Sequence, residues 1–368
     1  MKQEQAFSVI SRQKTAGKTT IGCFPLYPPL EIFTAMGLLP VILWNLKSDI
    51  KNFAESDKHI QHYACGVVRE LVQFALSDTG IFLDGFFSYN ACDTLRNLPE
   101  ILASSNKDAG KNVPMLRMHI PQVNRAQTVP NLYIKNEISQ LIHDIEKVFG
   151  VVFSSQRFHQ AVKSYTKMRS LCIEAEKRVA KRVLSFSTFC SVVLSNFFLP
   201  VEEQIINLMN LIGTAENIPE KKGTDILLSG IMPPPLHVMY AMERADLRVV
   251  ANDIASLRRS YGYSPKITDD PGEYYTDYFA NRFPCSTMLY QSDTRLTTFL
   301  DLVDSSGARG VIFLGQKFCE YEYFEFPYLK KQLKDKGIPV LELEFGVDDI
   351  QNTEAYSTRI EAFAELLA

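Results

Sequence analysis

Two cysteines stand where a predicted strand gives way to the next segment, a position at which a thiol can do chemistry. Cys319 follows the apolar run from Gly310 to Leu314, and Cys92 follows an apolar run that ends near Phe87. Ligands of open α/β sheets collect beyond the carboxyl ends of the strands. Cys92 also opens a predicted helix, whose free N–H groups and dipole favour a thiolate. Both thiols are therefore candidate nucleophiles or metal ligands.

The other cysteines divide into two groups. Cys65 precedes Gly66 on a predicted helix, and that glycine would let a bulky inorganic group approach closely. Cys285 follows a helix in a loop and fits either a structural or a functional role. The rest are expected to be packing residues: Cys23, Cys172 and Cys190. With no CxxC and no compact ferredoxin run, spacing alone favours separate buried cysteines over a metal site.

Composition narrows the class of protein. The chain has 368 residues, 46% hydrophobic and 22% charged, which is typical of a globular protein with two or three domains. A net charge of −3 without a long basic cluster argues against nucleic-acid binding. No apolar stretch is long enough for a membrane span or a signal peptide, so we expect a cytoplasmic protein. Seven cysteines, an odd number, then argue against a disulfide framework.

The hydrophobic pattern predicts the elements that must position these cysteines. Strands are expected at 20–24, 39–44, 81–87 and 113–119, and again at 225–231, 247–251, 310–314 and 339–343. Helices are expected at 30–36, 59–76, 93–104, 293–305, 327–336 and 354–367. Residues 132–217 show long helical periodicity without a convincing strand. The pair His59 and His62 has HxxH spacing, but nothing completes a zinc set, so a surface helix is expected there.

This alternation predicts an α/β protein with two doubly wound domains of the Rossmann or flavodoxin type, each with a parallel sheet. The expected division is an N-terminal α/β domain at 1–131, a helical bridge at 132–220 and a C-terminal α/β domain at 221–368. The two halves are alike in plan but show no internal sequence repeat.

Several segments together resemble one known family. They are IGCFPLYPPLEIFTAMGLLPVILW (21–44), NACDTLRNL, PGEYYTDYFANRFPCS, GVIFLGQKFCEYEYFEFPYLKKQLKDKGIPVLELE and STRIEAFAELL. On these motifs the chain resembles the 2-hydroxyacyl-CoA dehydratase family, which includes the D-component of 2-hydroxyglutaryl-CoA dehydratase and the benzoyl-CoA reductase subunits. It is most similar to the shorter β-type subunits. One segment, ANDIASLRRSYG, departs from the family pattern, because Asn252 replaces an acid and Ala255 stands where a cysteine often occurs.

The resemblance implies a cofactor and partners. Cys65, Cys92 and Cys319 match the positions at which the family holds a 4Fe-4S cluster, with the fourth iron left for another ligand. The family works anaerobically as a heterodimer of related α-type and β-type subunits, and a separate ATP-dependent iron-sulfur activator supplies the electron. One electron added to the thioester carbonyl of a 2-hydroxyacyl-CoA gives a ketyl radical anion that can expel the hydroxyl group, and iron-sulfur clusters reach the low potential this needs. The chain has no GxxxxGK[ST] loop, so ATP is not expected to bind here by that route.

Two other functions stay open from the sequence. A benzoyl-CoA reductase-type subunit would use the same cysteines to reduce an aromatic ring, and a cluster-free binding or scaffold protein would use none. Tyr27 and Glu31 are weak candidates for proton transfer, and their expected roles are those of a turn residue and of a helix-start acid favoured by the helix dipole. Glu320 and Glu322 are expected to be charges at the rim of the site. The neighbouring aromatic residues are expected in the core or at an interface: Tyr321, Tyr323, Phe324, Phe326 and Tyr328.

Overall fold

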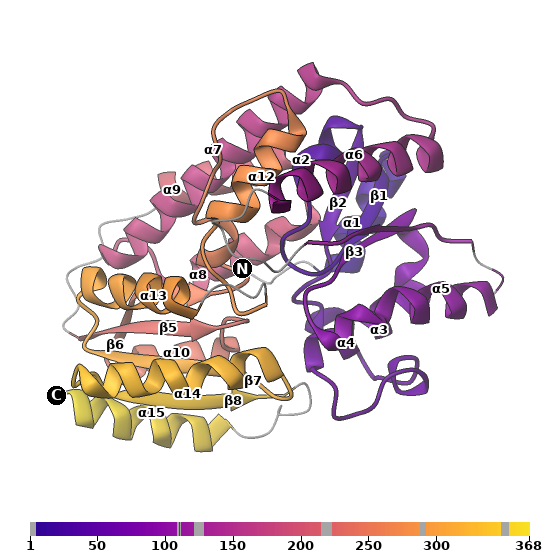
Figure 1. Ribbon diagram of the computed structural model, residues 1–368. Helices are drawn as coiled ribbons and strands as arrows, with labels where there is room; N and C mark the ends of the chain where they lie inside the picture. The colour runs from indigo at the N-terminus through magenta and orange to yellow at the C-terminus, as the bar shows by residue number, and fades with distance from the viewer. Residues whose placement is uncertain are drawn as a thin grey trace. The chain divides into compact units, whose positions relative to one another are not determined.

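The computed structural model describes residues 5–108, 110, 112–120, 129–214, 223–287, 292–346 and 353–368. The chain forms two compact units, each built on one sheet (Figure 1). Unit 1 comprises Met1–Arg169, Leu194–Asn207 and Tyr263–Arg282. Unit 2 comprises Ser170–Val193, Leu208–Gly262 and Phe283–Ala368.

Unit 1 contains a four-stranded parallel sheet in the order β2-β1-β3-β4. Its strands are β1 Thr19–Cys23, β2 Leu38–Ile42, β3 Gly85–Tyr89 and β4 Met115–Met118. All residues of β2 and β3 are buried, as expected for a parallel sheet with both faces covered. Helix α1 Ala6–Thr15 precedes β1, and the helices between the strands are α2 Leu30–Ala35, α3 Gly66–Leu76, α4 Asp93–Arg96 and α5 Leu98–Asp108. Three 3-10 turns, η1 Lys47–Asp49, η2 Ser56–Lys58 and η3 Asp78–Phe82, complete the connections.

Unit 2 repeats the same strand order, β6-β5-β7-β8, again with all strands parallel. The strands are β5 Thr224–Gly230, β6 Leu247–Ile254, β7 Gly310–Gln316 and β8 Val340–Phe345. The helices are α10 Leu236–Arg244, α11 Arg258–Tyr261, α13 Ser292–Ser306, α14 Glu320–Asp335 and α15 Thr353–Leu367. The two doubly wound parallel sheets confirm the predicted fold class.

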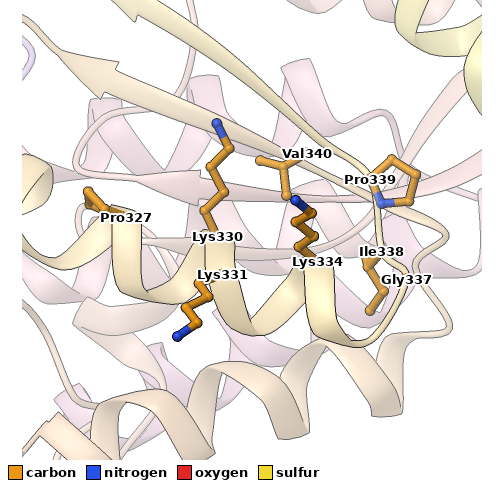
Figure 2. A pocket seen from close by; sticks show the side chains of 8 residues that line it. All are labelled: Pro327, Lys330, Lys331, Lys334, Gly337, Ile338, Pro339 and Val340. Carbon is orange, nitrogen blue, oxygen red and sulfur yellow. The ribbon is translucent and has the colours of Figure 1, made fainter.

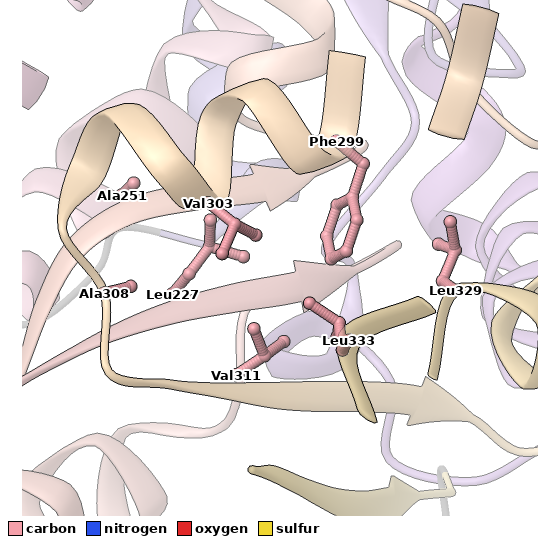
Figure 3. Close-up of a cluster of buried hydrophobic side chains, with 8 residues drawn as sticks. All are labelled: Leu227, Ala251, Phe299, Val303, Ala308, Val311, Leu329 and Leu333. Atoms are coloured by element: carbon pink, nitrogen blue, oxygen red, sulfur yellow. The ribbon is translucent and has the colours of Figure 1, made fainter. Parts of the chain in front are cut away.

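Helices cover both faces of the unit 2 sheet. On one face, Phe299 and Val303 from α13 and Leu329 and Leu333 from α14 pack on the strands (Figure 3). They meet the strand residues Leu227, Ala251 and Val311 together with Ala308. On the other face α15 lies so close to β7 that a Cβ atom at Gly310 would be 2.8 Å from the Phe363 ring. The apolar runs that predicted buried strands are therefore enclosed in a three-layer core.

The segment from 132 to 217 is helical as predicted, and its described part contains no strand. Its helices are α6 Val129–Phe149, α7 Ser155–Ala180, α8 Phe186–Ser195 and α9 Val201–Gly213, with η4 Asn196–Phe198 between the last two. Both units draw on it, because unit 2 begins at Ser170, within α7. The boundary expected at 220–221 lies outside the described residues, and the division into three domains stays a prediction.

Several predicted helix boundaries were wrong. Helix α14 begins at Glu320 and not at 327. Pro327, the predicted helix start, lies inside the helix, where it removes only one backbone donor. Helix α3 begins at Gly66, so the segment with His59 and His62 is exposed but is not helical. Helices α1 and α11 were not predicted. Helix α12 Pro271–Asn281 is the helix expected before Cys285, and Asp270 caps it by accepting from the Glu273 N–H at 3.0 Å.

The outer edge of β8 is covered by side chains of α15. Strand β8 bonds to β7 through the carbonyls of Pro339 and Phe345, so the carbonyls of Glu342 and Glu344 point the other way. Tyr356 donates its hydroxyl to the Glu344 carbonyl at 2.7 Å, and Arg359 donates to the Glu342 carbonyl at 2.6 Å. Two outward acceptors of this edge strand, the carbonyls of Glu342 and Glu344, are therefore satisfied.

Of the helices in the described part of the chain, none combines the length and the apolar character that crossing a membrane requires.

Candidate functional site

Cys92 and Cys319 occupy equivalent places in the two sheets. Each follows the third strand of a 2-1-3-4 sheet, and each lies three residues beyond the strand end, which is Tyr89 for Cys92 and Gln316 for Cys319. Each is also the N-cap residue of the next helix, α4 or α14. Both thiols are partly exposed, and neither caps its helix through a side-chain hydrogen bond. The structure thus confirms that both cysteines lie at the carboxyl edge of a sheet, where ligands of this fold collect.

Polar side chains fix the loop that carries each of these cysteines. Asn90 accepts from the Ile120 N–H at 2.7 Å and donates to the Ile120 carbonyl at 3.1 Å. Gln316 donates its side-chain amide to the Phe345 carbonyl at 3.1 Å. In both units the carboxyl end of the third strand is therefore tied to backbone at or just beyond the end of the fourth. Such ties hold a thiol in one place, as a ligand requires.

Cys65 is the N-cap residue of α3, and its carbonyl accepts from the N–H groups of Val68 and Arg69 at 3.0 and 3.2 Å. The Arg69 guanidinium holds the preceding segment, because it donates to Asp57 at 2.8 Å and lies 4.4 Å from the Phe53 ring centroid. Cys65 thus lies between α3 and the preceding segment, which Arg69 of α3 contacts at Asp57 and Phe53. Cys65, Cys92 and Cys319 are all N-cap residues.

The electrostatics of unit 1 link Cys65 and Cys92. Burial raises the pKa of the Cys92 thiol to about 11, the N–H groups of Leu95 and Thr94 act in the opposite direction, and the charge of Cys65 raises it further. Burial also raises the pKa of Glu70 to about 8, with Lys47 lowering it and Cys65 raising it. The Cys65 and Cys92 thiols therefore lie close enough for their charges to interact. Without a bound cation Cys92 is a neutral thiol at pH 7, and metal binding would release its proton.

The remaining cysteines are buried, unlike the partly exposed three. Burial raises the pKa values of Cys23 and Cys190, which keeps both thiols neutral. The packing role predicted for Cys23, Cys172 and Cys190 agrees with this burial. Cys285 lies in the loop after α12, where its Sγ accepts from Arg259 at 3.5 Å and lies 3.2 Å from the Thr287 hydroxyl.

Glu31 lies at the centre of a buried polar cluster in unit 1. Its carboxylate, 1% exposed, accepts from Tyr274 at 2.8 Å, from Tyr275 at 2.5 Å and from Arg169 at 2.5 Å. Burial raises the pKa of both tyrosines, so they stay protonated and donate. Tyr27 is also buried, with the Arg282 guanidinium 3.3 Å from its ring centroid. These contacts join α2 to α7 and α12, and a proton-transfer role for either candidate stays an untested prediction.

A charged cluster that the sequence pattern did not predict lies at the end of β6. Asp253 is fully buried and accepts from Arg259 at 3.0 and 2.8 Å, from Arg295 at 2.9 and 2.5 Å and from Ser229 at 2.8 Å. Burial alone would raise the pKa of Asp253, but the two arginines outweigh it and lower the pKa to about 2. In the sequence, the acid Asp253 at the end of a strand is followed by the pair Arg258 and Arg259, and this pattern could have predicted the cluster.

The residues after Cys319 only partly follow expectation. Glu320 is exposed as predicted, but Glu322 is buried at 2% exposure and accepts from the Gln316 N–H at 3.2 Å, so its prediction as a rim charge was wrong. Phe326 is a core residue, with its ring stacked 3.5 Å from that of Phe313. Phe324, in contrast, is 81% exposed. The predicted aromatic cluster therefore divides between core and surface.

The donor set suits an iron-sulfur cluster. Among the described residues no group of three or more His, Cys, Asp or Glu side chains is placed to hold a metal ion. Cys65 and Cys92 belong to unit 1 and Cys319 to unit 2, so each unit offers thiols at helix starts. Cysteine thiolates are the ligands of 4Fe-4S clusters, and helix N-termini favour their negative charge. The chemistry of these residues therefore fits the cluster.

Comparison with known proteins extends over almost the whole chain. Residues 25–367 match the family described as 2-hydroxyglutaryl-CoA dehydratase, D-component. The (R)-phenyllactyl-CoA dehydratase beta subunit of Clostridium sporogenes is 24% identical over 363 residues, covering 98% of this chain and 94% of the relative. The beta subunit of (R)-2-hydroxyglutaryl-CoA dehydratase from Acidaminococcus fermentans is 27% identical over 370 residues, covering 98% and 95%. A benzoyl-CoA reductase subunit of Thauera aromatica is 23% identical over 344 residues, covering 91% and 87%.

A match of this extent, on two doubly wound parallel sheets, leads to one conclusion. The chain belongs to the 2-hydroxyglutaryl-CoA dehydratase D-component family.

Proposed function

We propose that this chain is the β-type subunit of a 2-hydroxyacyl-CoA dehydratase, a hydro-lyase, and that Cys65, Cys92 and Cys319 hold a 4Fe-4S cluster in it. The observation that carries the proposal is that these three cysteines are N-cap residues and partly exposed, whereas the other four are buried. Beta subunits of two such dehydratases are relatives over 98% of this chain.

The residues around the cysteines have defined tasks in this proposal. When bound, the cluster would supply one electron at low potential, so that a 2-hydroxyacyl-CoA can lose water. The thiols of Cys65, Cys92 and Cys319 would hold this cluster as thiolates. Asn90 and Gln316 keep the two strand-end loops in place through their bonds to Ile120 and Phe345.

The proposal includes partners. A related α-type subunit would complete a cytoplasmic heterodimer and bind the acyl-CoA, and an ATP-dependent iron-sulfur activator would deliver the electron. This chain would relay that electron.

Iron and acid-labile sulfide content after anaerobic purification tests the cluster. The wild-type chain is expected to hold about four of each, the content of one 4Fe-4S cluster. Cys319→Ala, Cys92→Ala and Cys65→Ala should each lose most of it, whereas Cys190→Ala, a buried cysteine of α8, should retain it once folding is verified by circular dichroism. A folded wild-type chain that stays free of iron after reconstitution would refute the cluster and favour a scaffold protein.

A second function is supported by one observation. The benzoyl-CoA reductase subunit of Thauera aromatica matches over 91% of this chain, so the same cysteines could serve in the reduction of an aromatic ring. An assay of the complete enzyme with a 2-hydroxyacyl-CoA and with benzoyl-CoA separates the two. Loss of water without net reduction supports the dehydratase, and consumption of reductant with benzoyl-CoA supports the reductase.

A further inference from the structure

Glu70, on α3, is a buried carboxyl group without a partner. The buried carboxyl side chains in the described part of the chain, each at most 8% exposed, are Glu31, Glu70, Glu176, Asp253 and Glu322. The other four accept hydrogen bonds; Glu176, for example, accepts from Asn252 and Arg258, both at 2.7 Å. Glu70 is 7% exposed and forms no hydrogen bond or ion pair with any residue that the structure describes.

A charged side chain without a partner is ordinary at the surface but not in the interior. Lys331 and Lys334 line a groove of about 470 Å³ beside the second half of α14, and among the described residues no carboxylate pairs with either of them (Figure 2). Both side chains are exposed, so water solvates their ammonium groups. Glu70 lacks this solvent, and a buried polar group that makes no hydrogen bond costs free energy. A cost of this kind is typical of functional positions.

The buried polar side chains of α3 divide into two that hold the helix in place and one that does not. Arg69 donates to Asp57 at 2.8 Å, and Gln73 accepts from two backbone N–H groups of the segment before α3, at 2.9 and 3.1 Å. These bonds fix α3 to that segment. Glu70 adds no bond of this kind, so attachment of the helix does not explain its burial.

Glu70 lies close to one of the proposed cluster ligands. It follows Cys65, the N-cap residue of α3, by five positions, which is about 7.5 Å along the helix axis. Helical side chains lean toward the helix N-terminus, so the Glu70 carboxyl extends toward the end of α3 that Cys65 caps. Burial raises the pKa of Glu70 to about 8, Lys47 of η1 acts in the opposite direction, and the charge of Cys65 raises the pKa further. At pH 7 Glu70 is therefore a neutral acid.

Other charged groups around α3 lie in water. The helix packs against η2, η3 and α5. The charged side chains of these three segments are all exposed: Asp57, Lys58, Asp78, Glu100, Lys107 and Asp108. Lys47 and Cys65 are therefore the groups whose charges act on Glu70.

We infer that Glu70 is a proton site that tunes the cluster: protonated, it places no charge beside Cys65, and ionised, it makes the cluster harder to reduce. This inference rests on the proposed function, because it needs the cluster. Net charge around an iron-sulfur cluster is one of the quantities that set its potential. Where Glu70 is ionised before reduction, the reductant gives one electron to the cluster and the Glu70 carboxylate takes one proton from solvent, so that electron and proton arrive together.

The reduction potential of the anaerobically purified, cluster-loaded chain, followed by EPR between about pH 7 and pH 10, tests the inference. The potential of the wild type should fall as the pH rises, by at most about 59 mV per unit of pH, the value for one proton with one electron. Glu70→Gln keeps the shape of the side chain but cannot ionise, so it should lose most of this dependence.

Asp93→Asn is the matched control. Asp93 also lies beside a proposed ligand, Cys92, but its side chain is 67% exposed, so water solvates its charge. This variant should keep the wild-type dependence of the potential on pH.

The cluster-free chain tests the protonation of Glu70 by itself. The pKa of Glu70 is raised from 4.5 to about 8 in the folded chain, so the folded state binds this proton more tightly than the unfolded state. The resulting stabilisation is present below pH 4.5 and is lost as the pH rises to about 8. Glu70→Gln should therefore melt at a higher temperature than the wild type, by a margin that grows between pH 5 and pH 8.

Three outcomes overturn the inference. They are an equal dependence of the potential on pH in Glu70→Gln and wild type, a melting margin that stays constant with pH, or loss of iron from Glu70→Gln. Iron content of the wild type keeps the two proposals apart. A wild-type chain without iron refutes the cluster itself, whereas a loaded chain whose potential ignores Glu70→Gln refutes only the role of Glu70.

Discussion

Arg295 donates from both terminal nitrogens to the two oxygens of Asp253, at 2.9 and 2.5 Å, and Arg259 donates to the same carboxylate from a different helix. All three side chains are at most 4% exposed. One carboxylate at the end of β6 therefore neutralises charge from α11 and α13. Removing it leaves two buried guanidinium groups without this partner.

Asp253→Asn is therefore expected to lower the free energy of unfolding by about 3 to 5 kcal/mol, the usual cost of breaking a buried ion pair. Urea denaturation of the two proteins measures it. Asp225→Asn, which removes the partly exposed partner of Arg248, should cost about 1 kcal/mol or less. Equal losses in the two variants would contradict the central role of Asp253.

Acid should weaken the same cluster. The pKa of Asp253 is lowered from 3.8 to about 2 in the folded chain, so the folded state binds a proton less readily than the unfolded state. The resulting stabilisation is present above pH 4 and is lost as the pH falls from about 4 to 2. It is on the order of 2 kcal/mol, from about 1.4 kcal/mol per unit of pKa.

Stability curves of wild type and Asp253→Asn between pH 6 and pH 2.5 test this prediction. The difference between them should be constant above pH 5 and should shrink below pH 4. A difference that grows toward low pH would show that the carboxylate is not stabilised in the folded chain.

Glu31→Gln distinguishes a structural role from proton transfer. Because Glu31 accepts from Arg169, Tyr274 and Tyr275, the amide should destabilise the fold by about 3 kcal/mol. Tyr275→Phe removes one bond to a charged acceptor and should cost about 1.5 to 3 kcal/mol. A Glu31→Gln chain with wild-type stability but no dehydratase activity in the complete enzyme would support proton transfer.

At Gly315 a substitution by a single methyl group should have a clear effect. A Cβ atom there would lie 2.9 Å from Cζ of Tyr323, so the ring would have to move and release its 2.8 Å hydrogen bond to Glu344. Gly315→Ala should therefore lower the free energy of unfolding by about 1 to 3 kcal/mol.

The controls for Gly315→Ala vary the space that is open to the added Cβ atom. At Gly213, the last residue of α9, a Cβ atom would have nothing within 4 Å, so Gly213→Ala should be neutral. In a Tyr323→Ala background, the cost of Gly315→Ala should fall by at least half, because the obstructing ring is gone. If Gly315→Ala lowers the free energy of unfolding equally in both backgrounds, the Tyr323 ring is not the obstruction.

The sequence predicted those features that depend on local pattern. Apolar runs such as Gly310 to Leu314 identified all eight described strands, because strands covered on both faces must be apolar throughout. The strand-end rule placed Cys92 and Cys319 at the sheet edge. Their equivalence, three residues past the third strand in each unit, emerged only from the strand order.

Features that depend on tertiary contacts were missed. Pro327 suggested a helix start, but tertiary packing of Phe326 and Leu329 holds a helix that already begins at Glu320. Glu322 looked like a surface charge because a single sequence does not reveal that the Gln316 N–H would meet it. The partners of Glu31 lie more than 130 residues away along the chain, beyond the reach of any local pattern.

The cover that α15 places over β8 bears on how this chain can assemble. An exposed strand edge invites another chain to add a strand, which leads to swapped dimers or to polymers. With Tyr356 and Arg359 bonded to the Glu344 and Glu342 carbonyls, an incoming strand would have to displace both to reach these two acceptors. Association at this end of unit 2 is therefore favoured through helix side chains, which differ from protein to protein, over backbone, which every chain shares. The covered edge thus makes the choice of partner depend on sequence.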